Sequence, residues 1–571
     1  MHENREISCT SWPTEQDRSA KAINRTADMN VPEKSDCAVV PVNQPNNEGQ
    51  PSAEAGEGRA QTEENIVPSH MRPTQSGKRM SQGLHGVRQA AKERKQERFT
   101  ALLHHLSVGL LRDSFYALQR QASPGVDGVT WQEYETGLED RLVDLHSRVH
   151  RGAYRAQPSR RVYIPKADGR QRPLGIAALE DKIVQQAVVT ILNQIYEVDF
   201  KGFSYGFRPG RGPHQALDAL VAGIQWKRVN WVLDADIRGF FDNMNHEWTM
   251  KFVEHRVADR RILRLIQKWL KAGVSEDGQW SETKVGTPQG AVVSPLLANV
   301  YLHYVFDLWV EAWRKKVANG EVIVVRYADD LVVGFQYRTD AERFLQEFRE
   351  RLAKFGLELH ADKTRLIEFG RFAARDRKYR GEGKPETFTF LGFTHFCGQL
   401  NSSRAFIVWR ITAKKRMVAK LKAIKAELQR RKHHRTTEVG AWLRKVVLGY
   451  YQYHGVPGNS TQLRIFSRRV GRLWRSVLVR RSQRAQVRWD RLSPLLLRWI
   501  PPPRILHPYP DARFGATMGS QNLSLFRFPL VSAYRIGCFP SKGQEEANDA
   551  KYSVFRRLGC GLAGCRGTLR I

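Results

Sequence analysis

Two short acidic segments lie within apolar, strand-like sequence, and they restrict the possible folds of this chain more than any other feature. Asp236 lies in DADIRGFFDN, and Asp329 with Asp330 lies in VVRYADDLVV. A carboxylate in apolar surroundings is costly unless a cation or a metal ion compensates its charge. The apolar runs 322–325 and 331–335 therefore predict a buried hairpin with the YADD acids at its turn.

Three such carboxylates brought together repel one another, and a divalent cation removes that repulsion. Phosphoryl transfer uses this arrangement, because two Mg²⁺ ions about 3.5–4 Å apart hold the attacking and leaving oxygens. Mg²⁺ takes hard oxygen ligands, so a few carboxylates and substrate phosphates are sufficient. Taken alone, YADD is equally well explained as a β-turn with exposed aspartates, since Asp is common in turns.

Helices and strands alternate without a fixed period in the middle of the chain. The apolar spacing predicts helices over 89–121, 179–196 and 340–355, and strands over 161–165 and 232–237. The predicted fold class of this part is α+β. After residue 410 the pattern becomes helical, with a stripe at Met417, Leu421, Ile424 and Leu428.

Positive charge is concentrated in one segment. The chain carries 92 Lys and Arg against 58 Asp and Glu, a net charge of +34. Residues 401–500 hold 25 of these cations and only 3 acids, whereas residues 1–80 hold 9 cations and 12 acids in a polar sequence typical of disorder. Such an excess indicates a polyanionic partner, because Lys and Arg neutralise the phosphates of nucleic acids.

Composition also excludes several classes of protein. No apolar run reaches the roughly 18 residues that a transmembrane helix needs, so no membrane partner is expected. The N-terminus MHENREISCT has no secretory signal pattern, and six cysteines in 571 residues do not form a disulfide framework. A zinc nuclease is also not expected, because residues after 515 contain no histidine and no paired CxxC motifs.

Eight segments, in order, resemble the reverse transcriptases of bacterial mobile group II introns, proteins that also act as maturases. The resemblance extends from about residue 86 to about residue 515. The segments are SPGVDGVTW (123–131), KADGRQRPLGI (166–176), YGFRPGRGPHQAL (205–217), DIRGFFDNMNHE (236–247), GTPQGAVVSPLLANVYL (286–302), YADD (327–330), GLELHADKT (356–364) and FTFLGF (388–393).

The resemblance implies a right-hand polymerase, with fingers and a palm built from an antiparallel sheet and helices, followed by an α-helical thumb or maturase domain. The expected organisation is a disordered tail (1–85), a helical N-terminal extension (86–150), the reverse transcriptase fingers and palm (151–400), an RNA-binding thumb/maturase domain X (401–500), a short DNA-binding region (501–518) and a C-terminal tail of unknown role (519–571).

By the same resemblance, Asp236, Asp329 and Asp330 are the catalytic residues and bind two Mg²⁺ ions, for which Mn²⁺ can substitute. Asp234 and Asp242 fall beside this site and are interpreted as solvated or capping carboxylates.

Further residues are expected around the incoming nucleotide. Lys166 and Arg172, with Arg170 as a third candidate, flank a turn that the family places on the triphosphate; a solvated charged turn is the alternative. An aromatic that excludes a ribose 2′-OH is assigned to Phe241, with Phe240 as the second choice.

Two more residues complete the predicted nucleotide site. In the family, the glycine-containing loop 286–290 packs through Gln289 against the template–primer and the nascent base pair. Lys363 would approach the incoming nucleotide, although the family more often has Ser and Glu where this chain has His360 and Asp362. A solvent-exposed lysine on a hairpin is the alternative for Lys363.

The implied function is an RNA-directed DNA polymerase of a mobile intron that also binds its intron RNA and assists splicing and retrohoming. Its partners would be group II intron RNA, an RNA template with a DNA primer, target DNA and dNTPs, and its location the bacterial cytoplasm and nucleoid. Without a nuclease it would take its primer from elsewhere, such as a nascent strand. The alternatives are a maturase with a silent polymerase, or another bacterial reverse transcriptase of the retron or diversity-generating type.

Overall fold

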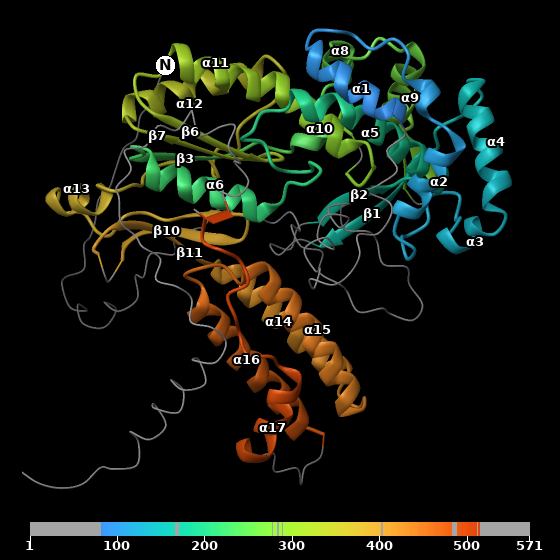
Figure 1. Cartoon of the computed structure of the whole chain (residues 1–571). Coiled ribbons are helices and arrows are strands. Elements are labelled where there is room, and N and C mark those ends of the chain that lie inside the picture. Colours follow the sequence, from blue (N-terminus) through green and yellow to red (C-terminus); the bar gives the residue numbers. More distant parts are fainter. Residues whose placement is uncertain are drawn as a thin grey trace, which may run out of the picture. The chain divides into compact units, whose positions relative to one another are not determined.

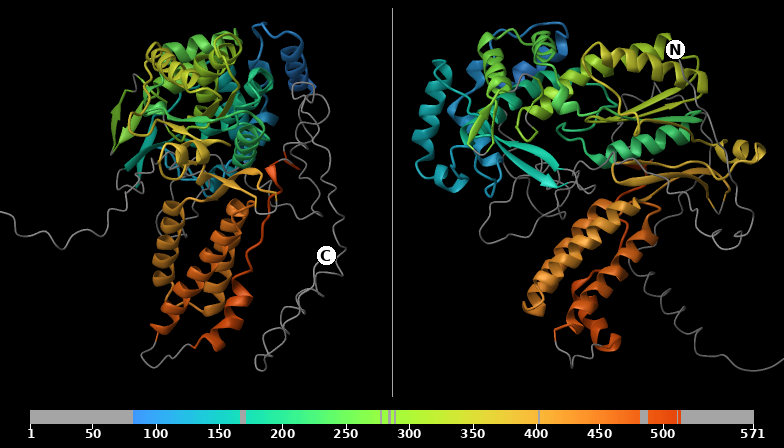
Figure 2. Two further views of the ribbon diagram at one scale, coloured as in Figure 1. Left: turned by 90° about the vertical axis from the view of Figure 1, so that its left-hand side faces the viewer. Right: turned by 180° about the vertical axis from the view of Figure 1, so that it is seen from behind.

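The computed structural model describes residues 82–165, 171–276, 278–282, 285–287, 289–400, 403–481, 488–510 and 512–513 (Figures 1 and 2). The predictions for the N-terminal tail, for Lys166 and Arg170, and for the tail after residue 513 lie outside these residues.

The central sheet carries the predicted YADD hairpin at its end. Its strand order is β6-β7-β3-β8, and every neighbouring pair is antiparallel. Helix α6 (Pro213–Trp226) contacts β6, while α12 (Arg338–Ala353) contacts β3 and β7 from the other face, so the sheet is covered on both faces (Figure 1). The hairpin and the 340–355 helix were predicted correctly, and α12 is followed by Gly356 at a φ of 71°. The strands are β6 (Val322–Tyr327), β7 (Asp330–Phe335), β3 (Trp231–Asp236) and β8 (Arg365–Glu368).

A second sheet is built on the predicted strand at 161–165. Strand β1 (Ser159–Pro165) pairs antiparallel with β2 (Gln171–Ile176) and parallel with β4 (Val274–Glu276), which pairs with β5 (Gln279–Ser281). Helix α5 (Leu179–Asp199) follows β2 directly, as the apolar spacing predicted.

The prediction of one helix over 89–121 is wrong, because three separate elements span this region. They are α1 (Gln82–Glu93), the single turn η3 (Leu103–His105) and α2 (Val108–Ala117). The segment between α1 and α2 bonds to residues 256–259 instead of continuing a helix: Phe99 N–H donates to the Arg256 carbonyl at 2.8 Å, and Asp259 accepts from the backbone N–H groups of Leu102 and Leu103 at 2.8 and 2.9 Å. Ser107 then starts α2 as its N-cap, accepting from Leu110 N–H.

Further helices complete the part of the chain before residue 380. These are α3 (Trp131–Glu135), α4 (Leu138–His150), α7 (Phe240–Asn243), α8 (His246–Glu254), α9 (Arg260–Lys271), α10 (Ser294–Leu302), the π-helical turn η4 (His303–Asp307), α11 (Leu308–Lys316) and α13 (Ala373–Tyr379).

A third antiparallel sheet leads into the C-terminal helices. It has the order β11-β10-β9 and is formed by β9 (Phe388–Phe390), β10 (Phe393–Gln399) and β11 (Phe406–Thr412). Helices α14 (Lys414–Arg430), α15 (Thr436–His454), α16 (Ser460–Val479) and α17 (Trp489–Trp499) follow. Their shared core contains the whole stripe predicted on α14: Met417, Leu421, Ile424 and Leu428.

Polar contacts join the segments on both sides of these helices to α6, which covers the central sheet. Arg410 on β11 forms a buried ion pair with Asp218 of α6 at 2.6 Å. The segment after α17 returns to the same place, where His507 stacks on His214 with ring centroids 3.8 Å apart and Arg513 approaches Asp218 at 3.1 Å. The predicted mixture of helices with mainly antiparallel strands is confirmed. No helix among the described residues is long and apolar enough to cross a membrane.

Buried histidines make the fold sensitive to acid. Burial lowers the pKa of His395 to about 3. An unfolded histidine takes up a proton near its ordinary pKa of about 6.5, so stability is complete above that pH and decreases as the pH falls towards 3. We expect His395→Leu to reduce the acid-side slope of the unfolding free energy by up to about 1.4 kcal/mol per pH unit, the value for one proton. Urea denaturation between pH 4 and 7 measures this slope. The matched control is the exposed His433→Leu, and equal slopes in wild type and His395→Leu would contradict the prediction.

Candidate active site

The structure brings the three predicted carboxylates to one end of the central sheet. Asp236 is the last residue of β3, Asp330 is the first residue of β7, and the two are register partners. Both residues are buried, with 8% and 6% of their surface exposed. Asp329 is half-buried in the two-residue turn that precedes Asp330. The sheet register therefore sets the spacing of the acids.

The turn itself has an unusual backbone conformation. Ala328 has a φ of 55°, a left-handed conformation that costs a residue with a Cβ about 1–2 kcal/mol. Gly206 packs directly against it, since a Cβ at residue 206 would lie 2.3 Å from the backbone nitrogen of Ala328. A side chain cannot be placed at residue 206 without moving the turn.

One cation lies against the first carboxylate. Lys363 Nζ is 3.5 Å from Asp236 Oδ2, and the backbone N–H of His360 donates to the Asp236 carbonyl at 2.8 Å. The loop that the sequence analysis assigned to the nucleotide is therefore held at the end of β3. Asp234 is only 1% exposed and lies inside strand β3, so its interpretation as a solvated carboxylate or a helix cap is wrong.

The donor set at this end of the sheet suits Mg²⁺ or Mn²⁺. Carboxylate oxygens are hard ligands of the kind that these ions prefer. Within the described part of the chain, no group of three or more His, Cys, Asp and Glu side chains is arranged as a metal cage. Mg²⁺ is usually held by one or two carboxylates together with substrate phosphates, and Asp236 with the neighbouring Asp329 and Asp330 at the same sheet end fits that pattern.

The two candidate aromatics occupy different environments. Phe240 is 2% exposed and packs edge-on against Tyr301 in the core, with centroids 6.1 Å apart. Phe241 is half-buried and contacts Phe207 at the surface. Only Phe241 of this pair is therefore accessible to a ligand.

The loop containing Gln289 is fixed to the residues that follow Phe241. Gly286 has a φ of 88°, and a Cβ there would lie 2.7 Å from the Asp242 carbonyl oxygen. The N–H of Thr287 donates to the Phe241 carbonyl at 2.8 Å, and Gln289 Nε2 lies 3.3 Å from an oxygen of the exposed Asp242.

The same loop also contacts the second sheet. The Gln289 carbonyl accepts a hydrogen bond from Gly175 N–H at 2.7 Å, and Gly175 lies on β2 three residues after Arg172. Arg172 is half-buried on this strand, opposite Ile164 of β1. The predicted triphosphate hairpin is thus attached to the loop that adjoins Phe241.

Sequence analysis missed the residues that support the YADD turn. Arg326 directly precedes Tyr327 and is completely buried, and its partners Asn299 and Asp307 come from α10 and η4. The available signal was a cation inside the otherwise apolar run VIVVRY, because a buried guanidinium requires polar partners.

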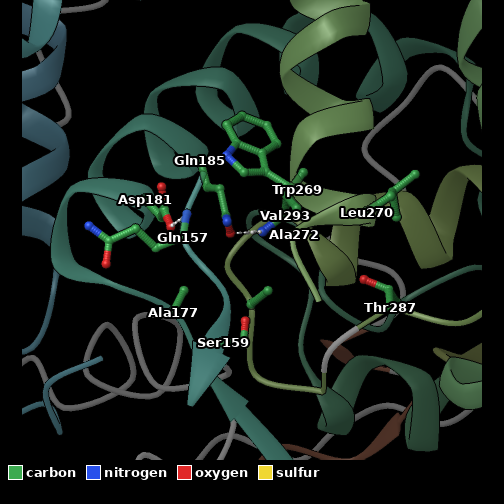
Figure 3. Close-up of a pocket in the computed structure, with 11 residues that line it drawn as sticks. Gln157, Ser159, Ala177, Asp181, Gln185, Trp269, Leu270, Ala272, Thr287 and Val293 are labelled. Atoms are coloured by element: carbon green, nitrogen blue, oxygen red, sulfur yellow. Dashed lines mark hydrogen bonds between the residues drawn. The ribbon is translucent and has the colours of Figure 1, made fainter. Parts of the chain in front are cut away.

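A small pocket is lined in part by Thr287, Ala291 and Val293, which come from the same stretch of chain as Gln289 (Figure 3). Asp181 on α5 accepts hydrogen bonds from the Tyr154 hydroxyl and from Gln157 N–H, and Gln185 accepts one from Val293 N–H. Burial raises the pKa of Asp181 to about 6. The side chains around the pocket are those of Gln157, Ser159, Ala177, Asp181, Gln185, Trp269, Leu270, Ala272, Thr287, Ala291 and Val293.

Comparison with known proteins gives a consistent set of relatives. The model of the family "Reverse transcriptase (RNA-dependent DNA polymerase)" matches residues 164–395. Protein YkfC of Escherichia coli (strain K12) is 35% identical over 276 residues, which cover 43% of this chain and 72% of YkfC.

Two further relatives have names that refer to introns. The group II intron-encoded protein LtrA of Lactococcus lactis subsp. cremoris is 36% identical over 225 residues, 38% of this chain and 37% of LtrA. The mitochondrial nuclear intron maturase 1 of Arabidopsis thaliana is 29% identical over 92 residues, 16% of this chain and 13% of that protein. The matched region of this chain therefore spans well under two thirds of both proteins.

The raised pKa of Asp181 gives a pH-dependent stability. An unfolded Asp ionises near pH 4, whereas Asp181 in the fold ionises near 6, so stability falls as the pH rises between these values and is constant above them. We expect Asp181→Asn to remove this loss, so that the unfolding free energy of the variant relative to wild type increases from pH 4 to 6 and then stays level. Urea denaturation measures it, with the exposed Asp362→Asn as control. If the difference in unfolding free energy between Asp181→Asn and wild type did not change with pH, the raised pKa of Asp181 would be contradicted.

Proposed function

The chain belongs to the reverse transcriptases of the group II intron type, which are RNA-directed DNA polymerases, and from this family membership we propose that it extends a DNA primer on an RNA template with dNTPs. The observation that carries the proposal is the register pairing of Asp236 with Asp330 beside the Ala328–Asp329 turn. This pairing puts acidic side chains from two neighbouring strands at one sheet end, which is what a polymerase site requires.

In this proposal Asp236 and Asp329 would hold two Mg²⁺ ions, and Asp330 would support them more weakly. Such ions would activate the primer 3′-hydroxyl and neutralise the triphosphate. Lys363, which lies 3.5 Å from Asp236, compensates the acidic charge in the free protein and is near enough to approach an incoming nucleotide. The sheet keeps the two buried acids at fixed positions, so little reorganisation is needed when substrate binds.

Nucleotide selection is assigned to the surface around Phe241. The half-buried Phe241 ring would lie under the sugar and exclude a ribose 2′-OH. Gln289, held near Asp242, would contact the nascent base pair, and Arg172 with Lys166 would bind the triphosphate. The hydrogen bond from Gly175 to the Gln289 carbonyl supports a joint action of these two regions.

The C-terminal helices are proposed to form the thumb/maturase domain and to bind intron RNA and the RNA–DNA duplex. Their segment, residues 401–500, has 25 cations and 3 acids, and a solvated helix face would normally mix charges. RNA binding would assist splicing, whose chemistry belongs to the RNA, and target-DNA binding during retrohoming is proposed for 501–518. Helix α14 alone exposes Lys414, Lys415, Lys422, Lys425 and Arg430.

Removing the carboxylate of Asp236 should abolish polymerisation. We expect Asp236→Asn to lower dTTP incorporation on a poly(rA)/oligo(dT) duplex with Mg²⁺ by at least about 100-fold, because an amide does not replace an anionic metal ligand. Asp362→Asn, at a position 93% exposed, is the matched control and should retain activity. No incorporation by a folded, RNA-binding wild type would refute the polymerase proposal in favour of a silent maturase. Equal activity of wild type and Asp236→Asn would refute the site.

Truncating the accessible aromatic should relax sugar selection. We expect Phe241→Ala to raise the ratio of UTP to dTTP incorporation by roughly 10-fold or more, since loss of a steric contact removes about 1–3 kcal/mol of discrimination. Single-nucleotide extension of the same duplex measures kcat/KM for both substrates. The core substitution Phe240→Leu is the control and should leave the ratio unchanged. An unaltered ratio in Phe241→Ala would exclude Phe241 as the gate.

A further inference from the structure

We propose that a buried network of Arg326, Asp307 and Asn299 holds the Ala328–Asp329 turn in the conformation that presents the catalytic acids. These are positioning residues, since none of them is placed in contact with substrate. The inference rests on the proposed polymerase function and extends it to Arg326 and Asp307, which lie outside the eight segments, and to Asn299, which lies within 286–302 but has no role assigned there.

Arg326 is the centre of the network. Its side chain is completely buried and makes two contacts with the Asp307 carboxylate, from Nε at 2.8 Å and from Nη2 at 2.6 Å. Nη1 donates to Asn299 Oδ1 at 2.9 Å and to the carbonyl oxygen of Ala328 at 3.1 Å. One guanidinium group therefore connects the helix α10–η4 directly to the backbone of the turn.

A second connection reaches the turn from its other side. Asn299 Nδ2 donates to the Gly206 carbonyl at 2.8 Å, and Gly206 is the residue that packs against Ala328. Backbone hydrogen bonds fix this segment to the same strand, from Tyr205 N–H to the Arg326 carbonyl at 2.8 Å and from Arg326 N–H to the Phe203 carbonyl at 2.9 Å. The side-chain oxygen of Asn299 thus accepts a hydrogen bond from Arg326, and its side-chain nitrogen donates one to Gly206, which packs against the turn.

The π-helical turn η4 explains how two residues of one helix reach the same guanidinium. Asn299 and Asp307 are eight residues apart. In a regular α-helix of about 3.6 residues per turn, that separation rotates the second side chain about 80° away from the first. A π turn accommodates one extra residue, so the pair behaves like residues seven apart, which lie within about 20° of one face.

The network is better explained by positioning than by stability. A buried ion pair contributes little net stability, because desolvation of the two charges offsets their attraction. A hydrogen-bonded polar network does, however, select one geometry. Here the selected geometry is strained, since Ala328 would otherwise favour a negative φ, and strained residues persist only where their surroundings over-determine them.

The test truncates Asn299 and then removes the strain. We expect Asn299→Ala to lower kcat for dTTP incorporation about 10-fold and to raise the Mg²⁺ concentration for half-maximal activity several-fold, with the Kd for poly(rA)/oligo(dT) within about twofold of wild type. Glycine adopts a positive φ without a Cβ penalty. Adding Ala328→Gly should therefore restore most of kcat and of the Mg²⁺ response. The proposal would be overturned if Asn299→Ala and the double variant lost kcat and the Mg²⁺ response equally, and if these losses followed the thermal stability of each variant.

A second measurement does not depend on catalysis. Hydrogen exchange of the amides from Tyr327 to Leu331 in the free protein should be faster in Asn299→Ala than in wild type. The matched control is Asn459→Ala, because Asn459 is an equally buried asparagine that bonds Thr412 and His454 away from the turn; its exchange at the turn and its Mg²⁺ response should match wild type. Unchanged exchange at the turn in Asn299→Ala would overturn the proposal. Faster exchange in a protein without any polymerase activity would support the positioning network and refute the proposed function.

Discussion

The antiparallel pairing of β3 with β7 is the constraint on which the site depends. It places Asp236 opposite Asp330, and side chains alternate between the faces of a strand, so a slip of one residue would move every side chain to the opposite face. Such a slip is opposed because the two faces pack into different clusters, Leu233 and Ala235 in one and Val232 in the other, and the slip would exchange these side chains. Packing of the core thus determines where the acids lie, although the acids themselves oppose burial.

Compensating charges are supplied by separate parts of the chain. Lys363, on the loop before β8, lies next to Asp236, while the positive charge of Arg326 is neutralised by Asp307. His303 adds no positive charge to this buried pair at neutral pH, because burial lowers its pKa to about 4. The end of the sheet therefore keeps an acidic character in a protein whose net charge is +34.

Sequence analysis predicted the parts of the fold and of the site that depend on local pattern. The YADD hairpin and the stripe on α14 follow from short-range apolar spacing, and both are present. The helix expected over 89–121 is absent, and the segment between α1 and α2 instead bonds to residues 256–259, far away in sequence. The acids could be recognised from a motif, but Arg326 meets Asn299 across 27 residues and meets Asp307 only because a π turn changes the helical register. Local periodicity contains no information about such contacts.

The junction with the C-terminal helices shows how a strongly basic segment can be joined to the rest of the protein. Arg410 and Arg513 share one buried acid, Asp218, so the carboxylate there is already used by two cations. A third positive charge at this place would be unfavourable. The stacked rings of His214 and His507 add none, because burial lowers the pKa of both histidines and leaves them neutral. The attachment consequently uses few acids, although residues 401–500 carry 25 cations.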